Sequence, residues 1–484
     1  MTCGAAVARA GEEVSMTKLL GLALALVASG GLAAENPPVL VSQAGPGRTL
    51  SLTVYNVGRA LVRDARPVAL PSGTCALEFR DIAERVMPET VAISGDGVTV
   101  LEQNYEYDLL SPQTLLAKYL GRDVTLVTEE PGGAPGAVVR KEMVGRLLSM
   151  ENGTVWRIGD RIVANPPYRE LVFGQLPENL RERPTLVWLL KSERGGERRL
   201  EATYLTAGIG WKADYVLTLD ASGEQGGLLG WVTLDNTSGA SYPDATLQLV
   251  AGEVHLAPEA RPGPQPMMMA AKAASAEMKE EAFAEYHLYT LERPTTIKDR
   301  QKKQVALLEA DNVKVTKRYV VASPQWWYLQ RIGRQKQDVR VDVEIANRAE
   351  NHLGMPLPAG VVRLYQKDRR GQAQFVGEDR IEHTPKDETV KVTMGNAFDV
   401  VAERRQIDYR KLADNLYEDA FEVTLRNHKD AAVTVEVRDQ LGGEWEMLAN
   451  SHPFEKLSAS GVAFAVPVPA NGQAVLTYRV RVRF

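Results

Sequence analysis

Apolar residues fall at every second position over much of this chain, and at four places the alternation ends at an asparagine. Alternation of period two buries one face of a β-strand. An asparagine carboxamide can bond to backbone just beyond it and so close the strand into a turn. The four copies are Leu50, Leu52 and Val54 before Asn56; Val232 and Leu234 before Asn236; Val341, Val343 and Ile345 before Asn347; and Val423 and Leu425 before Asn427.

Two interpretations of this repeated pattern remain open. Its unequal spacing favours several related sandwich modules over a short-period solenoid. Alternatively, the pattern is simply how antiparallel strands end. Both interpretations predict one fold class, which is mainly β. It comprises several antiparallel, immunoglobulin-like β-sandwich modules, a small inserted β-barrel or meander, and few short helices.

Turns and prolines divide the chain into segments. Ser111-Pro112 and a closing Gly121 predict one helix, and apolar runs separated by turns predict a small barrel or meander over 121–172. A proline-dense, Met- and Ala-rich stretch predicts a flexible loop or linker at 257–284. The predicted organisation is a signal peptide at 1–34, an N-terminal β domain at 35–110, a helix plus barrel or meander at 111–185, a sandwich in two parts at 186–256 and 285–400, and a C-terminal sandwich at 401–484.

Residues 16–34 have the composition of an export signal. Lys18 precedes an apolar run, and small residues permit cleavage after Ala33 or Ala34. Met16 is the more natural start of such a signal. The run is too short to span a bilayer comfortably, and no later apolar stretch approaches twenty residues. The sequence therefore predicts a periplasmic or extracellular location, with no transmembrane helix after cleavage.

Charge and cysteine content exclude some partners. The formal net charge of the 484 residues is -5 and the basic residues are dispersed, which disfavours a nucleic-acid partner. Cys3 precedes the export signal, so the mature chain keeps Cys75 alone, without an internal disulfide partner. We expect Cys75 to be a small buried hydrophobe on a strand. An intermolecular or reactive thiol is the alternative.

The sequence offers no catalytic, cofactor-binding or metal-binding constellation. Gly208, Gly210 and Ala213 match a loose dinucleotide fingerprint, but the stretch continues as a strand where that fingerprint requires a helix. The histidines lack the spacing of a metal site; they are His255, His287, His352, His383, His428 and His452. We therefore assign no catalytic residue, cofactor or metal, and the question of enzymatic activity stays open.

Trp326, Trp327 and Tyr328 form the one cluster that suggests recognition. Adjacent residues on a strand point to opposite faces, so at least one ring would be exposed unless both faces are covered. An exposed ring can stack on a sugar or anchor a protein partner. Burial of the cluster between two sheets is the alternative.

The last residues alternate between two faces. Tyr478, Val480, Val482 and Phe484 share one face, and arginines occupy the other. A terminal aromatic after such alternation is typical of the closing strand of outer-membrane barrels, but long charged runs elsewhere do not fit a lipid-facing surface. The alternation favours the last strand of a sandwich.

A series of motifs resembles a known bacterial family. The motifs are Tyr204-Leu-Thr-Ala-Gly-Ile-Gly-Trp-Lys-Ala-Asp-Tyr215, Gly230-Trp-Val-Thr-Leu-Asp-Asn-Thr-Ser-Gly239, Asp244-Ala-Thr-Leu-Gln-Leu-Val-Ala-Gly252, Met355-Pro-Leu-Pro-Ala-Gly360, Gly377-Glu-Asp379 and Gly395-Asn-Ala-Phe-Asp399. Over roughly 190–484 the order of these motifs resembles domain-of-unknown-function family 4139, whose relatives include proteins named mucoidy inhibitor A. The resemblance implies a secreted, β-rich envelope protein and brings no catalytic residues with it.

These observations favour an exported cell-envelope protein that acts by surface recognition, as a structural or interaction module. The expected partner is an envelope protein or a polysaccharide, and the oligomeric state stays open. One alternative is a hydrolase of envelope polymers whose site is assembled from distant residues. A second alternative is an outer-membrane-associated component.

Overall fold

The computed structural model describes residues 37–106, 108–131, 138–177, 180–252 and 278–484. The export signal expected at 1–34 lies outside these residues, as does most of the linker expected at 257–284. The end of that expected linker is a strand, β17 (Met278–Phe283), and not a loop. The fold is mainly β, as predicted.

An N-terminal module packs two sheets against each other. One sheet has the order β1-β4-β12-β6, and the other contains β2-β3-β13-β5. The strands β12 and β13, expected to open the sandwich at 186–256, pair with β4, β6 and β3 of this module. Cys75 lies fully buried in its core. The elements are β1 (Val39–Ser42), β2 (Thr49–Tyr55), β3 (Arg59–Leu70), β4 (Gly73–Phe79), η1 (Pro88–Thr90), β5 (Ala92–Ser94), β6 (Val98–Glu106), β12 (Thr185–Ser192) and β13 (Gly196–Ala207).

A small subdomain is inserted between the neighbouring strands β6 and β12. Its helix begins as the sequence predicts, with Pro112 at its first position and a reciprocal capping box between Ser111 and Thr114. The sequence predicts a barrel or a meander here. The structure has a meander, which is an open sheet of order β10-β9-β8-β7-β11. The elements are α1 (Pro112–Lys118), β7 (Asp123–Pro131), β8 (Val138–Ser149), β9 (Val155–Ile158), β10 (Arg161–Ala164) and β11 (Glu170–Val172).

A middle module continues the N-terminal one. Strand β16 pairs with β2 in parallel, so the two modules share a sheet and a continuous core. The opposite sheet runs β24-β23-β14-β15-β20. The elements are β14 (Ile209–Leu219), β15 (Gln225–Asn236), β16 (Tyr242–Ala251), β17, β18 (Tyr286–Leu291), β19 (Thr295–Ile297), β20 (Gln301–Ser323), β22 (Arg340–Ala346), η3 (Ala349–Asn351), β23 (Gly360–Lys367), β24 (Ala373–Ile381) and β25 (Thr389–Asn396).

A C-terminal module forms a separate sandwich with its own core. One sheet runs β21-β26-β27-β32-β29, and the other contains β28-β31-β30. Tyr478, Val480 and Val482 of the last strand are buried in this core, as the alternation at the chain end predicts. The elements are η2 (Gln325–Tyr328), β21 (Gln335–Gln337), β26 (Val400–Ala413), β27 (Leu416–Asn427), β28 (Val433–Gln440), β29 (Glu444–Asn450), β30 (Phe454–Lys456), β31 (Gly461–Val468) and β32 (Gly472–Arg483).

The long strand β20 joins the middle and C-terminal modules. Its residues up to Lys314 pair with β15, and from Val315 they pair with β22. From Tyr319 to Ser323 the strand also pairs with β28, in parallel. At about 3.3 Å per residue the 23 residues of β20 extend for roughly 75 Å. One continuous strand therefore belongs to both modules.

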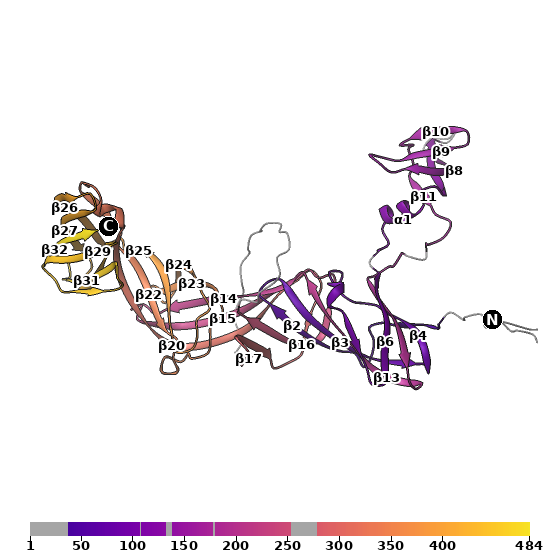
Figure 1. Cartoon of the computed structure of the whole chain (residues 1–484), viewed down its shortest axis with the longest axis horizontal. Coiled ribbons are helices and arrows are strands. Elements are labelled where there is room, and N and C mark those ends of the chain that lie inside the picture. The colour runs from indigo at the N-terminus through magenta and orange to yellow at the C-terminus, as the bar shows by residue number, and fades with distance from the viewer. Residues whose placement is uncertain (1–36, 107, 132–137, 178–179, 253–277) are drawn as a thin grey trace, which may run out of the picture.

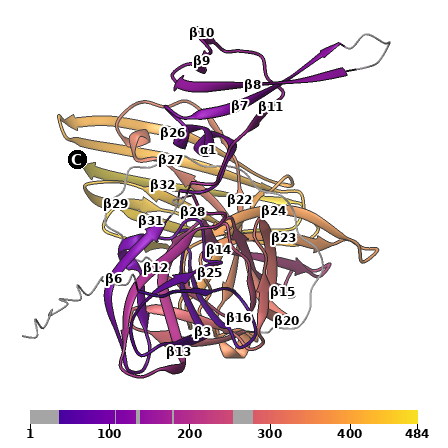
Figure 2. The ribbon, with the colours of Figure 1, turned by 90° about the vertical axis from the view of Figure 1, so that its right-hand side faces the viewer.

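The modules follow one another along the molecule. Figure 1 shows the C-terminal module at one end, the N-terminal module near the other, and the inserted sheet standing away from the body. Viewed from the N-terminal end, strands of the C-terminal module run across those of the modules in front (Figure 2). Most strand pairs are antiparallel, but β1·β4, β14·β23, β16·β2 and β20·β28 are parallel, which the alternation did not predict.

Three of the four sequence-predicted asparagines are buried at equivalent crossovers. In each, the carboxamide nitrogen donates to two carbonyls and the carboxamide oxygen accepts a backbone N–H. Asn347 donates to the carbonyls of Met355 (2.8 Å) and Pro385 (2.9 Å) and accepts from the Gly354 N–H (3.0 Å). Asn236 and Asn427 repeat the arrangement. Asn56 differs, because it lies exposed in the turn between β2 and β3.

Replacement of Asn347 by alanine should destabilise the middle module by at least about 2 kcal/mol, because two buried carbonyls lose their donor. The matched control is Asn56→Ala, which should change the free energy of unfolding by no more than about 0.5 kcal/mol. Denaturant unfolding followed by tryptophan fluorescence measures both. Equal costs at the two positions would contradict the bridging role of Asn347.

Candidate functional site

The aromatic cluster singled out in the sequence lies in η2, a 3-10 turn, and not on a strand as assumed. Its position directly after β20 and Pro324 explains the difference, since the chain turns there between sheets. Trp326 is 52% exposed, whereas Trp327 and Tyr328 are buried. Only Trp326 of the three can therefore present most of a ring face to a ligand or partner.

Trp327 and Tyr328 face a buried ion pair at the centre of the C-terminal module. The Arg404 guanidinium donates to both carboxylate oxygens of Asp439, at 2.7 and 3.2 Å, and to the Tyr478 hydroxyl at 2.6 Å. Its third nitrogen donates to Gln337 at 3.0 Å, and its carbon lies 5.6 Å from the Trp327 ring centroid. These groups come from β26, β28, β32, β21 and η2, so the pair ties the two sheets together.

Electrostatics keep this pair ionised. Burial alone would raise the pKa of Asp439, but the charge and hydrogen bonds of Arg404 hold that pKa below its usual value. Burial favours a lower pKa for Arg404. The nearby charge of Asp439 opposes burial, and the pKa of Arg404 is raised. Two of the three aromatic residues thus support a structural ion pair.

Replacement of Arg404 by methionine should destabilise the C-terminal module by about 3–5 kcal/mol, because Asp439 would stay buried without a counter-charge. The neighbouring Arg405→Met is the matched control. Arg405 pairs with Glu422 at 2.9 Å on a more exposed face, and its loss should cost under about 1 kcal/mol. Thermal unfolding by circular dichroism compares the two, and similar costs would argue against a central role for Arg404.

A large cleft lies where β20 changes partners between the middle and C-terminal modules. Its volume is about 1460 Å³, compared with roughly 300–1,000 Å³ for typical small-ligand pockets. One wall is the turn between β14 and β15 together with β20, and the other is formed by β28, β31 and the start of β30. We call this the inter-module cleft. Its lining comes from both modules.

Several charged side chains of the inter-module cleft neutralise one another. Glu344 pairs with Arg318 at 2.9 Å, and Glu436 pairs with Arg438 at 2.7 Å. Asp220 accepts bonds from the Ser222 hydroxyl and the Gly223 N–H, both at 2.7 Å, within its own turn. These carboxylates therefore already have protein partners.

Two lysines in the cleft behave differently. Lys317 donates to the Gln366 carboxamide at 3.3 Å, and the Lys429 ammonium lies 5.6 Å from the Tyr319 ring centroid. Among the described residues, neither ammonium has a carboxylate within ion-pair distance. Burial lowers the pKa of Lys317, and the nearby charge of Lys429 lowers it further, against the opposing effect of Asp220 and Glu224. The cleft thus holds two neighbouring positive charges.

The fold fixes both lysines. The Lys317 ammonium donates to Gln366 and lies close to Gly223, where an added Cβ would come within 2.0 Å of its nitrogen. The Asn427 carboxamide accepts the Lys429 N–H at 3.0 Å and so fixes the crossover that carries Lys429. Sequence reasoning did not single out either lysine. The available signal was the position of Lys429 just after the fourth asparagine motif.

Asp419 is an unusual carboxyl group at one end of the C-terminal module. Its side chain is fully buried, one oxygen accepts from the Gln406 carboxamide at 2.7 Å, and the other has no partner among the described residues. Burial raises the pKa of Asp419 to about 7; the Gln406 bond opposes this, and the charges of Asp408 and Glu418 add to it. The folded protein therefore holds a proton that the unfolded chain releases near pH 3.8.

This pKa predicts a stability that falls as the pH rises from about 4 to 7, because the folded state binds the proton and the unfolded state does not. Asp419→Asn removes the titration. Its stability relative to the parent should therefore increase by roughly 3–4 kcal/mol between pH 4 and pH 8, because the pKa of Asp419 rises from 3.8 to about 7 on folding. Exposed Asp414→Asn is the control and should show no such trend. A pH-independent difference for Asp419→Asn would contradict the assignment.

The remaining sequence candidates are dispersed. Burial raises the pKa of the Cys75 thiol. His287 contacts Glu280 at 2.8 Å on the β17–β18 hairpin, whereas His452 contacts Ser451 in the C-terminal module; His255 lies outside the described residues.

Within the described ranges, no three His, Cys, Asp or Glu side chains gather as metal ligands, and no helix has the length and apolarity needed to cross a membrane.

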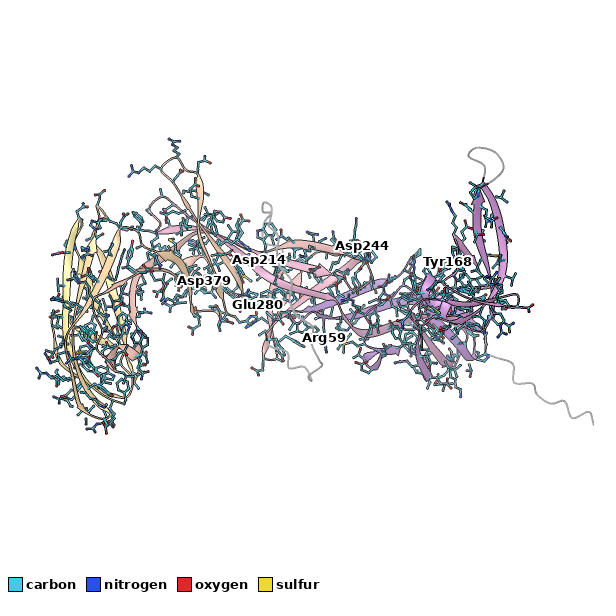
Figure 3. The ribbon with its side chains drawn as sticks, turned by 90° about the horizontal axis from the view of Figure 1, so that it is seen from above. Arg59, Tyr168, Asp214, Asp244, Glu280 and Asp379 are labelled. Atoms are coloured by element: carbon cyan, nitrogen blue, oxygen red, sulfur yellow. The ribbon has the colours of Figure 1, made fainter. Side chains whose placement is uncertain are left out.

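The motifs behind the family resemblance gather in and around the middle module, where they make structural contacts. Asp214 pairs with Arg363 at 3.2 Å, and Asp379 accepts the Thr393 N–H at 2.7 Å. Figure 3 labels both aspartates in the middle of the body, between the C-terminal module and Arg59. Tyr215 donates to the Pro358 carbonyl at 2.8 Å. These motif residues hold neighbouring strands and loops together.

No protein-family model matches this chain, and no curated protein matches it. The resemblance to domain-of-unknown-function family 4139 therefore stays a prediction from the motifs.

Proposed function

We propose that this chain is an exported cell-envelope protein that acts by surface recognition, with the inter-module cleft as its recognition surface. The observation that carries the proposal is the cleft itself, which combines a volume of about 1460 Å³ with two lysines that have no carboxylate within ion-pair distance among the described residues. Concave surfaces with convergent polar groups are common binding sites of proteins. The export signal expected at 16–34 supports the location.

The scaffold favours recognition of an extended ligand. The walls of the cleft come from two modules that share β20, so their separation is set by a continuous strand. A preformed surface loses little entropy when a ligand binds, which favours affinity. The family resemblance, which implies a secreted envelope protein, points in the same direction.

Thr434→Trp tests the role of the cleft, because exposed Thr434 lines it and an indole there would obstruct a ligand. The mature chain, tagged and incubated with envelope extract, should retain a specific partner that Thr434→Trp loses at least about tenfold. The control is Gln473→Trp, an equally exposed position on β32 outside the cleft. Trp326→Ala should leave retention unchanged.

Two results would overturn the proposal. One is retention by Thr434→Trp equal to that of the parent, with loss in Trp326→Ala, which would assign recognition to the aromatic residue. The other is a full-length product with residues 1–34 intact in the cytosolic fraction after cell fractionation.

A further inference from the structure

We propose that the inter-module cleft binds an acidic polysaccharide, one anionic group of which lies between the ammonium groups of Lys317 and Lys429. This inference rests on the proposed function and adds the chemistry of the ligand.

The charge arrangement is the first support. Two ammonium groups are held near each other in a partly buried cleft, and among the described residues neither has a carboxylate within ion-pair distance. Glu344 and Glu436 pair with arginines and Asp220 bonds within its own turn, while Glu224 acts on Lys317 only at longer range. Like charges placed together disfavour the unliganded fold, and a protein gains from such a pair when a counter-charge binds there. A carboxylate or phosphate group on the ligand supplies that counter-charge.

Preorganisation is the second support. Lys317 is held by the Gln366 carboxamide at 3.3 Å, and Lys429 is held against the Tyr319 ring. Long lysine side chains normally lose rotamer freedom when they bind. Here the fold already restricts both lysine side chains, so less rotamer entropy is lost when an anion binds to them.

The rest of the lining distinguishes a polysaccharide from an acidic peptide. Protein interfaces rely on a buried apolar core with large anchors, whereas this cleft is lined mainly by charged side chains, with hydroxyl and carboxamide groups among them. Such groups bond to sugar hydroxyls, and the half-buried rings of Tyr319 and Phe454 offer surfaces on which a sugar ring can stack. The polar lining residues are Ser222, Gln225, Thr316, Gln366 and Thr434.

The test uses oligomers of galacturonic acid as the probe, neutral dextran as the matched uncharged polymer, and polyglutamate as the acidic peptide. Isothermal titration of the mature chain should detect binding of the galacturonate oligomers only, weakened by added salt. Lys317→Gln and Lys429→Gln should each weaken binding by about tenfold or more, as expected for a lost charged hydrogen bond. Lys336→Gln, an exposed lysine outside the cleft, should have no effect.

A double variant tests whether both lysines hold one anionic group. If they do, the combined loss should be smaller than the product of the single losses, because each single change already disrupts the shared contact. The unliganded lysine variants should unfold at temperatures no lower than the parent, since each relieves like-charge repulsion. Loss of binding therefore cannot be ascribed to loss of fold.

Several outcomes would overturn the inference. Equal binding of dextran, or lysine variants that bind like the parent, would exclude an anionic contact at this pair. Polyglutamate binding with the same lysine dependence would replace the polysaccharide with an acidic protein segment. If Thr434→Trp abolishes capture from envelope extract while both lysine variants retain it, the recognition role of the cleft stands and this inference alone fails.

Discussion

The fold depends on how the middle and C-terminal modules satisfy the backbone where the chain crosses from one sheet to the other. A crossover leaves carbonyls without ladder partners, and a buried carbonyl without a donor is costly. Asn236, Asn347 and Asn427 each solve this problem in the same way, with one carboxamide that donates to two carbonyls and accepts one N–H. The recurrence of this bridge at three crossovers favours related modules over a generic way of ending strands.

Buried charge reinforces the modules at both ends of the molecule. In the N-terminal module Arg48 and Arg66 both bond to the Asp64 carboxylate, at 2.7 and 2.6 Å, and the Arg66 guanidinium lies 3.7 Å from the Phe79 ring centroid. In the C-terminal module Arg404 and Asp439 have the corresponding role. Such pairs contribute little net stability compared with apolar residues, but the loss of one partner is severe. They therefore restrict how the two sheets can be arranged.

Alternation in the sequence was enough to predict the fold class. Ser111-Pro112 and Gly121 predicted the capped helix, and the spacing of turns predicted a barrel or meander, because these features depend on local contacts. Alternation could not predict which strands become neighbours. The parallel pairing of β2 with β16, and the return of β12 and β13 to the N-terminal module, depend on contacts between distant segments. The aromatic cluster was misassigned to a strand because the chain leaves β20 at Pro324 and turns there between two sheets.

The candidate site could not be predicted from the sequence for the same reason. Lys317 and Lys429 are unremarkable in sequence, and they become neighbours only because β20 leaves β15 at Lys314 and then pairs with β28. Asn351 accepts the Lys314 N–H at 2.7 Å and donates to its carbonyl at 3.0 Å, which fixes the strand at that change of partner. Asn427 fixes the crossover that presents Lys429. The buried carboxamides that complete the modules therefore also determine where the two positive charges lie, so recognition in the cleft depends on the same interactions as the fold.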